Sequence, residues 1–423
     1  MKLLHKLLGW VDARFPLTAT WKAHVSEYYA PKNFNFWYFF GSLALLVLVI
    51  QIASGIFLTM NYKPDALFAF ASVEYIMRDV QWGWLLRYIH STGASMFFVV
   101  VYLHMFRGLM YGSFRKPREL LWIIGMIIYL MLMAEAFMGY LLPWGQMSFW
   151  GAQVIVNLFS SVPFIGPDLA LLIRGDFVIS DVTLNRFFAL HVIAIPLVLV
   201  LIVVAHLVAL HEVGSNNPDG IEIKKHKDAK GKPLDGIPFH PYYTVKDGVG
   251  VVGFLIIFCA IIFFAPDMGG YFLEDNNFIP ANPMKTPEHI APVWYFTPYY
   301  AILRAVPPMF GSQFPGVVAM GVATMAFFFL PWLDRGKVKS IRYRGPIYKI
   351  FLTLFVISFI GLGTLGLLPA TPVYLGCTGT GRGVLRLLPA DALVYQDRQV
   401  QARTGSCDIQ IRPRTVKELR KVR

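Results

Sequence analysis

The sequence predicts an all-α, polytopic membrane protein. Hydrophobic residues make up 56% of the 423 residues and charged residues only 15%, a balance that is typical of chains crossing a bilayer several times. Seven stretches are apolar over the roughly 20 residues that a helix needs to cross the hydrocarbon core. Two of these stretches contain regularly spaced histidines, which indicate function as well as fold.

The elements can be assigned in order from hydropathy. Residues 3–21 are polar, aromatic and amphipathic, so we expect a segment on the membrane surface and not a cleavable signal peptide. The seven predicted spans cover about residues 35–60, 86–111, 119–141, 184–210, 248–266, 315–334 and 347–369. Residues 144–172, which prolines interrupt, and the short aromatic segment 286–304 are predicted to lie at the membrane surface.

The charges of the loops predict the orientation of the chain. The loops after the second, fourth and sixth spans carry the basic clusters 115–118, 224–232 and 335–344, whereas the alternate loops are mainly acidic. By the positive-inside rule, the N-terminus and the basic loops are cytoplasmic. The formal net charge of +13 therefore needs no nucleic-acid partner. The second and fourth spans then run parallel, from outside to inside.

The four histidines of these two spans are the strongest functional signal. His90 and His104 are 14 residues apart, and His191 and His206 are 15 apart. In an α-helix each pair lies near one face, with roughly 21–22 Å between its members. A neutral imidazole in the bilayer is costly without a partner. We therefore expect His90 with His191, and His104 with His206, each to clamp one haem iron. The alternative is four separately satisfied buried histidines.

Matched glycines support this hypothesis. Gly41 and Gly55 are 14 residues apart in the first span, and Gly125 and Gly139 are 14 apart in the third. Glycine weakens a helix, so the spacing suggests that something flat and bulky presses on the backbone at two depths. Close packing of helices is the alternative. The three cysteines form no CxxC pair, which argues against a disulfide framework and a c-type haem.

Five motifs carry a resemblance to a known family. They are residues 87–90 (RYIH), 104–108 (HMFRG), 139–146 (GYLLPWGQ), 211–218 (HEVGSNNP) and 238–243 (PFHPYY). These motifs resemble cytochrome b of the quinol–cytochrome c reductase (cytochrome bc) complex, and the resemblance extends from the N-terminus to about Tyr374. It implies a four-helix bundle that holds two non-covalent b-type haems, followed by further helices.

The resemblance also implies an activity and partners. Family members form a dimeric complex with an iron–sulfur (Rieske) protein and cytochrome c1, embedded in membrane lipid. They oxidise quinol near the outer face and reduce quinone near the inner face, which contributes to proton translocation. One electron goes to the iron–sulfur protein and the other passes through a low- and a high-potential haem. The 15-residue histidine interval and the lysine-rich loop indicate a bacterial inner-membrane protein.

The chain divides accordingly into five regions. They are a surface segment 1–34, the di-haem bundle 35–212, a cytoplasmic loop 213–247, the C-terminal transmembrane helices 248–370 with the outer quinol-site loop 280–304, and an atypical basic tail 371–423. Similar members continue into an eighth span, but residues 375–423 contain no 17-residue apolar run. We expect no eighth span there and no part in haem or quinone binding. The tail reads either as an altered reading frame or as a genuine soluble terminus.

The resemblance assigns roles to cations beside the haems and to an inner pocket. Arg87 and Arg107 can pair with haem propionates, with interfacial snorkelling as the alternative. His211 and Asp247 match the inner quinone pocket, where they can hydrogen-bond a quinone and pass protons. Lys246 is a plausible proton carrier, with a surface salt bridge as the alternative. Alone, His211 would read as a solvated loop histidine.

The outer pocket departs from the family pattern. Members usually carry a Pro-Glu-Trp-Tyr motif, whose glutamate accepts a quinol proton, but residues 292–295 read PVWY. Because Val293 cannot accept a proton, another group must do so or the proton must leave through water. The residues that we assign to this pocket are Trp294, Tyr295, Tyr300 and, as substitute acceptors, Glu288 with Tyr140 or His289. A loop glutamate such as Glu288 is ordinarily just solvated.

Two other functions fit part of the pattern. A secondary transporter or ion channel also carries intramembrane histidines and glycines, but it would bind no chromophore. A di-haem cytochrome b that anchors a dehydrogenase would lack the segment containing Trp294 and Tyr295. A reduced-minus-oxidised visible spectrum separates these possibilities.

Overall fold

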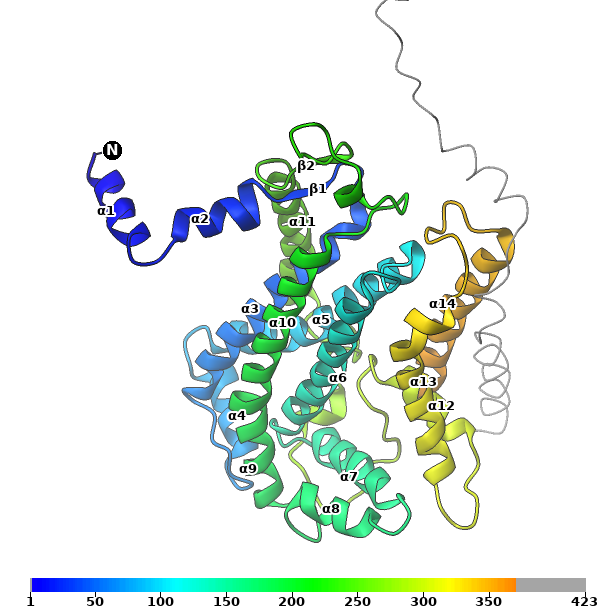
Figure 1. The fold of residues 1–423 in the computed structure, drawn as a ribbon. Helices are drawn as coiled ribbons and strands as arrows, with labels where there is room; N and C mark the ends of the chain where they lie inside the picture. The colour runs from blue at the N-terminus through cyan, green and yellow to red at the C-terminus, as the bar shows by residue number, and fades with distance from the viewer. Residues whose placement is uncertain (1, 370–423) are drawn as a thin grey trace, which may run out of the picture.

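The computed structural model describes residues 2–369 of the chain (Figure 1). In this part, seven helices are long and apolar enough to cross a membrane: Phe36–Thr59, Gly83–Tyr111, Glu119–Leu141, Asp181–Val213, Tyr242–Phe264, Phe314–Leu333 and Pro346–Leu367. The number and order of the predicted spans are thus confirmed, although the fifth begins six residues earlier than hydropathy predicts. The basic tail, and with it the prediction that no eighth span follows, lies outside the described residues.

Four helical segments form a bundle (Figure 1). Helix α3 (Phe39–Thr59) packs against α5 (Gly83–Tyr111), and α6 (Glu119–Leu141) packs against α10 (Ile195–Val213). Helix α9 (Asp181–Ala189) and the π-helical turn Leu190–Ala194 lead directly into α10.

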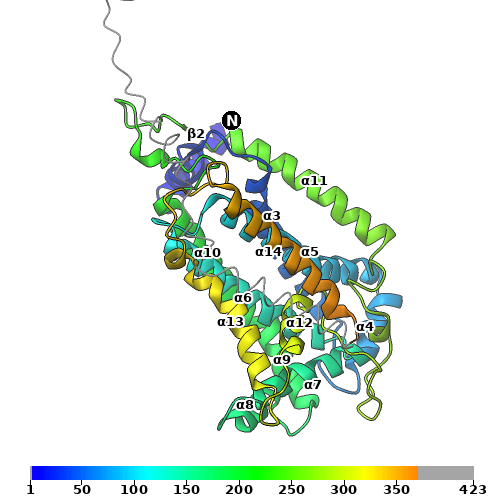
Figure 2. The same ribbon diagram turned by 90° about the vertical axis from the view of Figure 1, so that its right-hand side faces the viewer.

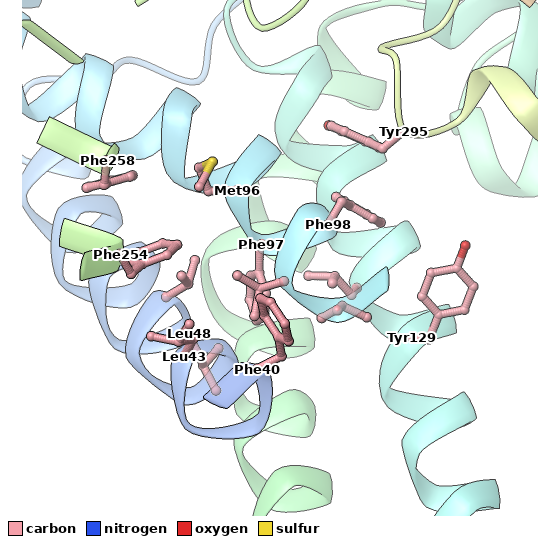
Figure 3. Close-up of a cluster of buried hydrophobic side chains, with 14 of the residues drawn as sticks. Phe40, Leu43, Leu48, Met96, Phe97, Phe98, Tyr129, Phe254, Phe258 and Tyr295 are labelled. Carbon is pink, nitrogen blue, oxygen red and sulfur yellow. The ribbon is translucent and has the colours of Figure 1, made fainter. Parts of the chain in front are cut away.

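The main core lies on one side of this bundle, where α3 and α5 meet α11 (Tyr242–Phe264) and α6. Figure 3 shows Leu48 of α3 and Met96 of α5 beside Phe254 and Phe258 of α11. Lipid tails are as apolar as these side chains, so close van der Waals packing is what stabilises the contacts.

The remaining helices lie around the bundle. Helices α13 (Phe314–Leu333) and α14 (Pro346–Leu367) complete the set of spans, with α11 on the other side of the molecule (Figure 2). The predicted surface segments contain the helices α7 (Gln146–Ser160), α8 (Gly166–Arg174) and α12 (Thr297–Ala305), and α4 is Ala69–Arg78. Helix α12 packs against both α13 and α14 and is largely buried.

The N-terminal segment approaches the loop between the fourth and fifth spans. Helices α1 (Lys2–Asp12) and α2 (Leu17–Trp21) extend away from the body of the molecule (Figure 1). Strand β1 (Tyr29–Pro31) pairs antiparallel with β2 (Gly236–Pro238) of that loop. The pairing brings residues 21–28 next to the C-terminal end of α10, where His211 lies.

An ion network joins the three basic loops. Arg118 donates to both carboxylate oxygens of Glu222 at 2.9 and 2.8 Å, and Lys339 donates to the same carboxylate at 2.7 Å. Burial acts to raise the pKa of Glu222, but the hydrogen bonds from Arg118 and Lys339 outweigh it and hold the pKa at about 2. Because these residues come from three different loops, the loops share one side of the molecule, as the charge pattern predicts.

Candidate functional site

The four histidines form two pairs. One member of each pair lies on α5, and the other lies on the π-helical turn Leu190–Ala194 or on α10. The ring centres of His90 and His191 are 6.2 Å apart, and those of His104 and His206 are 6.5 Å apart, with the rings steeply inclined. A metal–imidazole bond is about 2 Å long, so two imidazoles on one metal have ring centres roughly 6 Å apart. The pairing expected from topology is present, and each pair has the separation that one iron requires.

Each of the four matched glycines faces one of these histidines. A Cβ added to a glycine would meet an imidazole carbon at 3.2 Å for Gly41 and His104, 3.3 Å for Gly55 and His90, 3.3 Å for Gly125 and His206, and 2.3 Å for Gly139 and His191. The glycine spacing thus repeats the histidine spacing because each imidazole packs directly on the backbone of the neighbouring helix.

Alanine substitutions on α6 test this packing. Gly139→Ala would drive its Cβ into the ring of His191, so we expect loss of most of the outer haem. Gly125→Ala is the matched comparison on the same helix: its Cβ would lie 3.3 Å from His206, a tight contact that a shift of a few tenths of an ångström relieves, and the helix gains about 1 kcal/mol of propensity. We expect this variant to keep both haems. Equal haem content per polypeptide in the two variants would contradict the role of Gly139.

Two arginines on α5 lack an anionic partner. Arg87 and Arg107 are half-buried, and neither forms an ion pair with a described residue. The Nε of Arg107 is buried without a hydrogen-bond partner, and its guanidinium lies over the ring of Tyr38. An unpaired cation in this setting is costly. Both side chains are therefore suited to bind an anionic group such as a haem propionate. The paired histidines are likewise suited to bind the haem iron.

At the predicted inner pocket, His211 lies among residues of the N-terminal segment. Its ring packs against Tyr28 (4.6 Å) and His24 (5.2 Å), and Tyr28 is 3.4 Å from the hydroxyl of Ser215. No sequence pattern indicates His24 and Tyr28 as residues of this pocket, because only the pairing of β1 with β2 brings them here.

The other two inner-pocket residues lie on α11 and face different neighbours. Asp247 lies near Ser42 of α3, and Lys246 donates to the carbonyl of Phe34 at 3.1 Å. Among the described residues, no hydrogen bond joins either of them to His211. Their joint action on one quinone stays a prediction.

At the predicted outer pocket, the PVWY segment packs on α5. Trp294 donates to Ser95 at 3.1 Å, and the ring of Tyr295 stacks on Phe98 with centres 4.0 Å apart. Val293 is buried. Tyr300 donates to the carbonyl of Ile290 at 3.4 Å. The segment thus supplies a buried aromatic wall but no carboxylate of its own.

The carboxylate at this wall belongs to Glu274 and not to Glu288. The hydroxyl of Tyr140, which the sequence already assigns to the pocket, donates to Glu274. Burial raises the pKa of Glu274 to about 7, although the hydrogen bond from Tyr140 lowers it in part. Burial, and then the charge of Glu274, raise the pKa of Tyr295. By contrast, Glu288 is exposed, and His289 contacts the carbonyl of Leu367 at 2.8 Å.

Loop contacts position Glu274. The amide oxygen of Asn277 accepts from the backbone of Ser148 at 2.9 Å, and Gly145 forms an isolated β-bridge with Pro280. A Cβ at Gly145 would lie 2.3 Å from that same amide oxygen, so only glycine allows the approach. These contacts fix the loop on the start of α7, immediately after the helix that carries Tyr140. The packing of this loop on α7 brings together Tyr140 and Glu274, which are far apart in sequence.

Comparisons with known proteins agree with this geometry. The family model described as cytochrome b/b6/petB matches residues 25–214, and that described as cytochrome b (C-terminal)/b6/petD matches residues 280–381. The chain is 68% identical over 371 residues to a cytochrome b of Allochromatium vinosum, covering 87% of this chain and 89% of the relative. It is 53% identical to a cytochrome b of Rhodospirillum rubrum, covering 88% of each. A solved structure titled hyperthermophilic respiratory Complex III matches with a TM-score of 0.83 and 39% identity, over 90% of this chain and 96% of that one.

Proposed function

The chain belongs to the cytochrome b family as the cytochrome b subunit of a quinol–cytochrome c oxidoreductase, respiratory Complex III, and we propose that its two histidine pairs hold two b-type haems. His90 and His191 hold the outer haem, and His104 and His206 hold the inner one. Arg87 and Arg107 bind propionates. The observation that carries this assignment is the equal separation of the two pairs, at 6.2 and 6.5 Å.

The membrane setting follows the charge pattern. The protein is a multi-pass membrane protein, and we propose that its three basic loops face the cytoplasm of a bacterial cell. A Rieske iron–sulfur protein, cytochrome c1, membrane lipid and a second copy of the complex are the proposed partners. Two haems held at these depths supply one-electron transfer between the outer and inner faces.

At the outer pocket, the protein accepts protons from bound quinol. Trp294 and Tyr295 provide an aromatic wall, and Tyr300 lies on the adjoining helix. With Val293 in place of the usual glutamate, we propose that Tyr140 and Glu274 act as the relay. Tyr140 takes a proton from the quinol hydroxyl as its own proton passes to the Glu274 carboxylate, which supports catalysis only while that carboxylate is ionised.

At the inner pocket, His211 and Asp247 hydrogen-bond the two carbonyls of quinone and supply protons as it is reduced. Lys246, exposed beside Asp247, carries protons from the cytoplasm. The aromatic contacts of His211 with Tyr28 and His24 support a pocket wall at this depth.

His211→Leu tests the quinone chemistry. Leucine keeps bulk but removes the hydrogen bond and the titratable proton, so we expect quinone reduction to slow by about 10²-fold, the lower end of acid–base contributions. Stopped-flow spectra of the purified complex, started with quinol, should show electrons accumulating on the inner haem. His226→Leu, an exposed loop histidine, is the control and should behave as the parent. Parent-like reoxidation in His211→Leu would exclude His211. A parent complex that failed to reduce cytochrome c with quinol would overturn the function itself.

A further inference from the structure

The two histidine pairs have different polar surroundings. In the outer pair, Nδ1 of His191 lies 2.9 Å from the backbone carbonyl of Glu135 and 3.1 Å from its carboxylate oxygen Oε1. Nδ1 of His90 lies 2.9 Å from the hydroxyl of Ser54. In the inner pair, Nδ1 of His206 is buried without a hydrogen-bond partner among the described residues, and Nδ1 of His104 lies 3.4 Å from the guanidinium of Arg107. Only the outer pair therefore has a carboxylate at an imidazole nitrogen.

Glu135 is unusual for its position in the membrane. Among the seven described spans, Glu135 and Asp247 are the acidic residues that lie more than two residues from a helix end. Asp247 is assigned to the inner pocket, whereas neither haem ligation nor the two quinone pockets uses Glu135. Its second carboxylate oxygen, Oε2, is buried and has no hydrogen-bond partner. An acidic group so placed is costly and usually functional.

The fold gives Glu135 access to His191 through one turn of α6. Gly139 lies four residues further on, on the same face, and its missing side chain lets the imidazole approach the helix. The ring therefore packs on Gly139 while Nδ1 points to Glu135. The backbone carbonyl of Glu135 orients the ring through its hydrogen bond, and the carboxylate places an acidic group beside the same nitrogen.

We propose that Glu135 is a positioning residue for His191 and sets the midpoint potential of the outer haem below that of the inner one. The backbone carbonyl of Glu135 accepts the Nδ1 proton of His191, and a carboxylate 3.1 Å from the same nitrogen makes the imidazole a stronger donor to its metal. A stronger donor stabilises the oxidised iron and lowers its potential. This inference rests on the proposed ligation of the outer haem by His191. It assigns the lowering of the outer haem's potential to the side chain of Glu135.

Glu135→Gln is the direct test, because glutamine keeps the shape and removes the carboxylate. In the purified complex at a fixed pH, we expect the outer haem to titrate at a higher potential and the inner haem to be unchanged. The low-spin ferric signal of the outer haem should shift as well. Glu119→Gln makes the same chemical change 16 residues earlier on α6, and we expect it to leave both potentials unchanged.

A second variant, Glu135→Asp, keeps the proposal testable if the Glu135→Gln complex assembles poorly. Glu135→Asp keeps a carboxylate one methylene shorter, so its outer haem should shift in the same direction but by less. An unchanged outer potential in both variants, or an equal shift of both haems, would overturn the proposal. His191→Ala separates its failure from that of the ligand assignment. If His191→Ala keeps the outer haem, the ligation is wrong, whatever Glu135 does.

Discussion

His191→Ala should remove the outer haem and leave the inner haem in place, halving the haem content of the complex. The imidazole is one of two ligands that we assign to one iron, and alanine offers no replacement. The equivalent change at the other depth, His206→Ala, should remove only the inner haem. Quinol-driven reduction of cytochrome c should fall to background in both variants, because the electron path crosses both haems.

The reduced-minus-oxidised spectrum and a haem-to-polypeptide ratio measure this effect. His226→Ala, in the exposed loop between α10 and α11, is the matched control and should keep both haems. Full haem content in His191→Ala would exclude this residue as a ligand. Loss of both haems in every histidine variant, with the polypeptide still assembled, would exclude two independent sites.

Glu274→Gln should slow quinol oxidation by roughly 10²-fold, because glutamine cannot take the proton that Tyr140 relays. Turnover of the parent should rise as pH increases through about 7, since the raised pKa of Glu274 leaves the carboxyl protonated below that pH. The Gln variant should lose this inflection. Val293→Glu in the same variant should restore part of the rate.

Glu288→Gln is the control that separates the two carboxylates. Glu288 is exposed and Glu274 is half-buried beside Tyr140, so we expect parent-like turnover and pH dependence in Glu288→Gln. The opposite pattern, with a slow Glu288→Gln and a normal Glu274→Gln, would return the role to Glu288. Parent-like rates in both variants would indicate that the proton leaves through water.

The features that the sequence predicts correctly depend on local periodicity. The spans follow from the length of helix that crosses a bilayer. The pairing of His90 with His191 follows from helix geometry once the charge rule makes two spans parallel. The 14-residue spacing of the matched glycines indicates contacts at two depths, but only the structure shows that each glycine faces an imidazole.

The features that the sequence does not predict depend on contacts between distant segments. Glu274 reaches the outer pocket because Asn277 accepts a hydrogen bond from Ser148 at the start of α7, 129 residues away in sequence. His24 reaches His211 through the pairing of β1 with β2. No spacing rule connects these residues, so the sequence favours Glu288, which is close to Val293 along the chain, whereas the structure places Glu274 beside Tyr140.

A redox titration of the purified complex tests most directly whether this chain holds two haems between two quinone pockets. The titration follows the b-type absorbance against potential and is combined with a haem-to-polypeptide ratio. We predict two haems per chain, which titrate as two separate one-electron components. A single component with one haem per chain, or no b-type absorbance, would contradict the account.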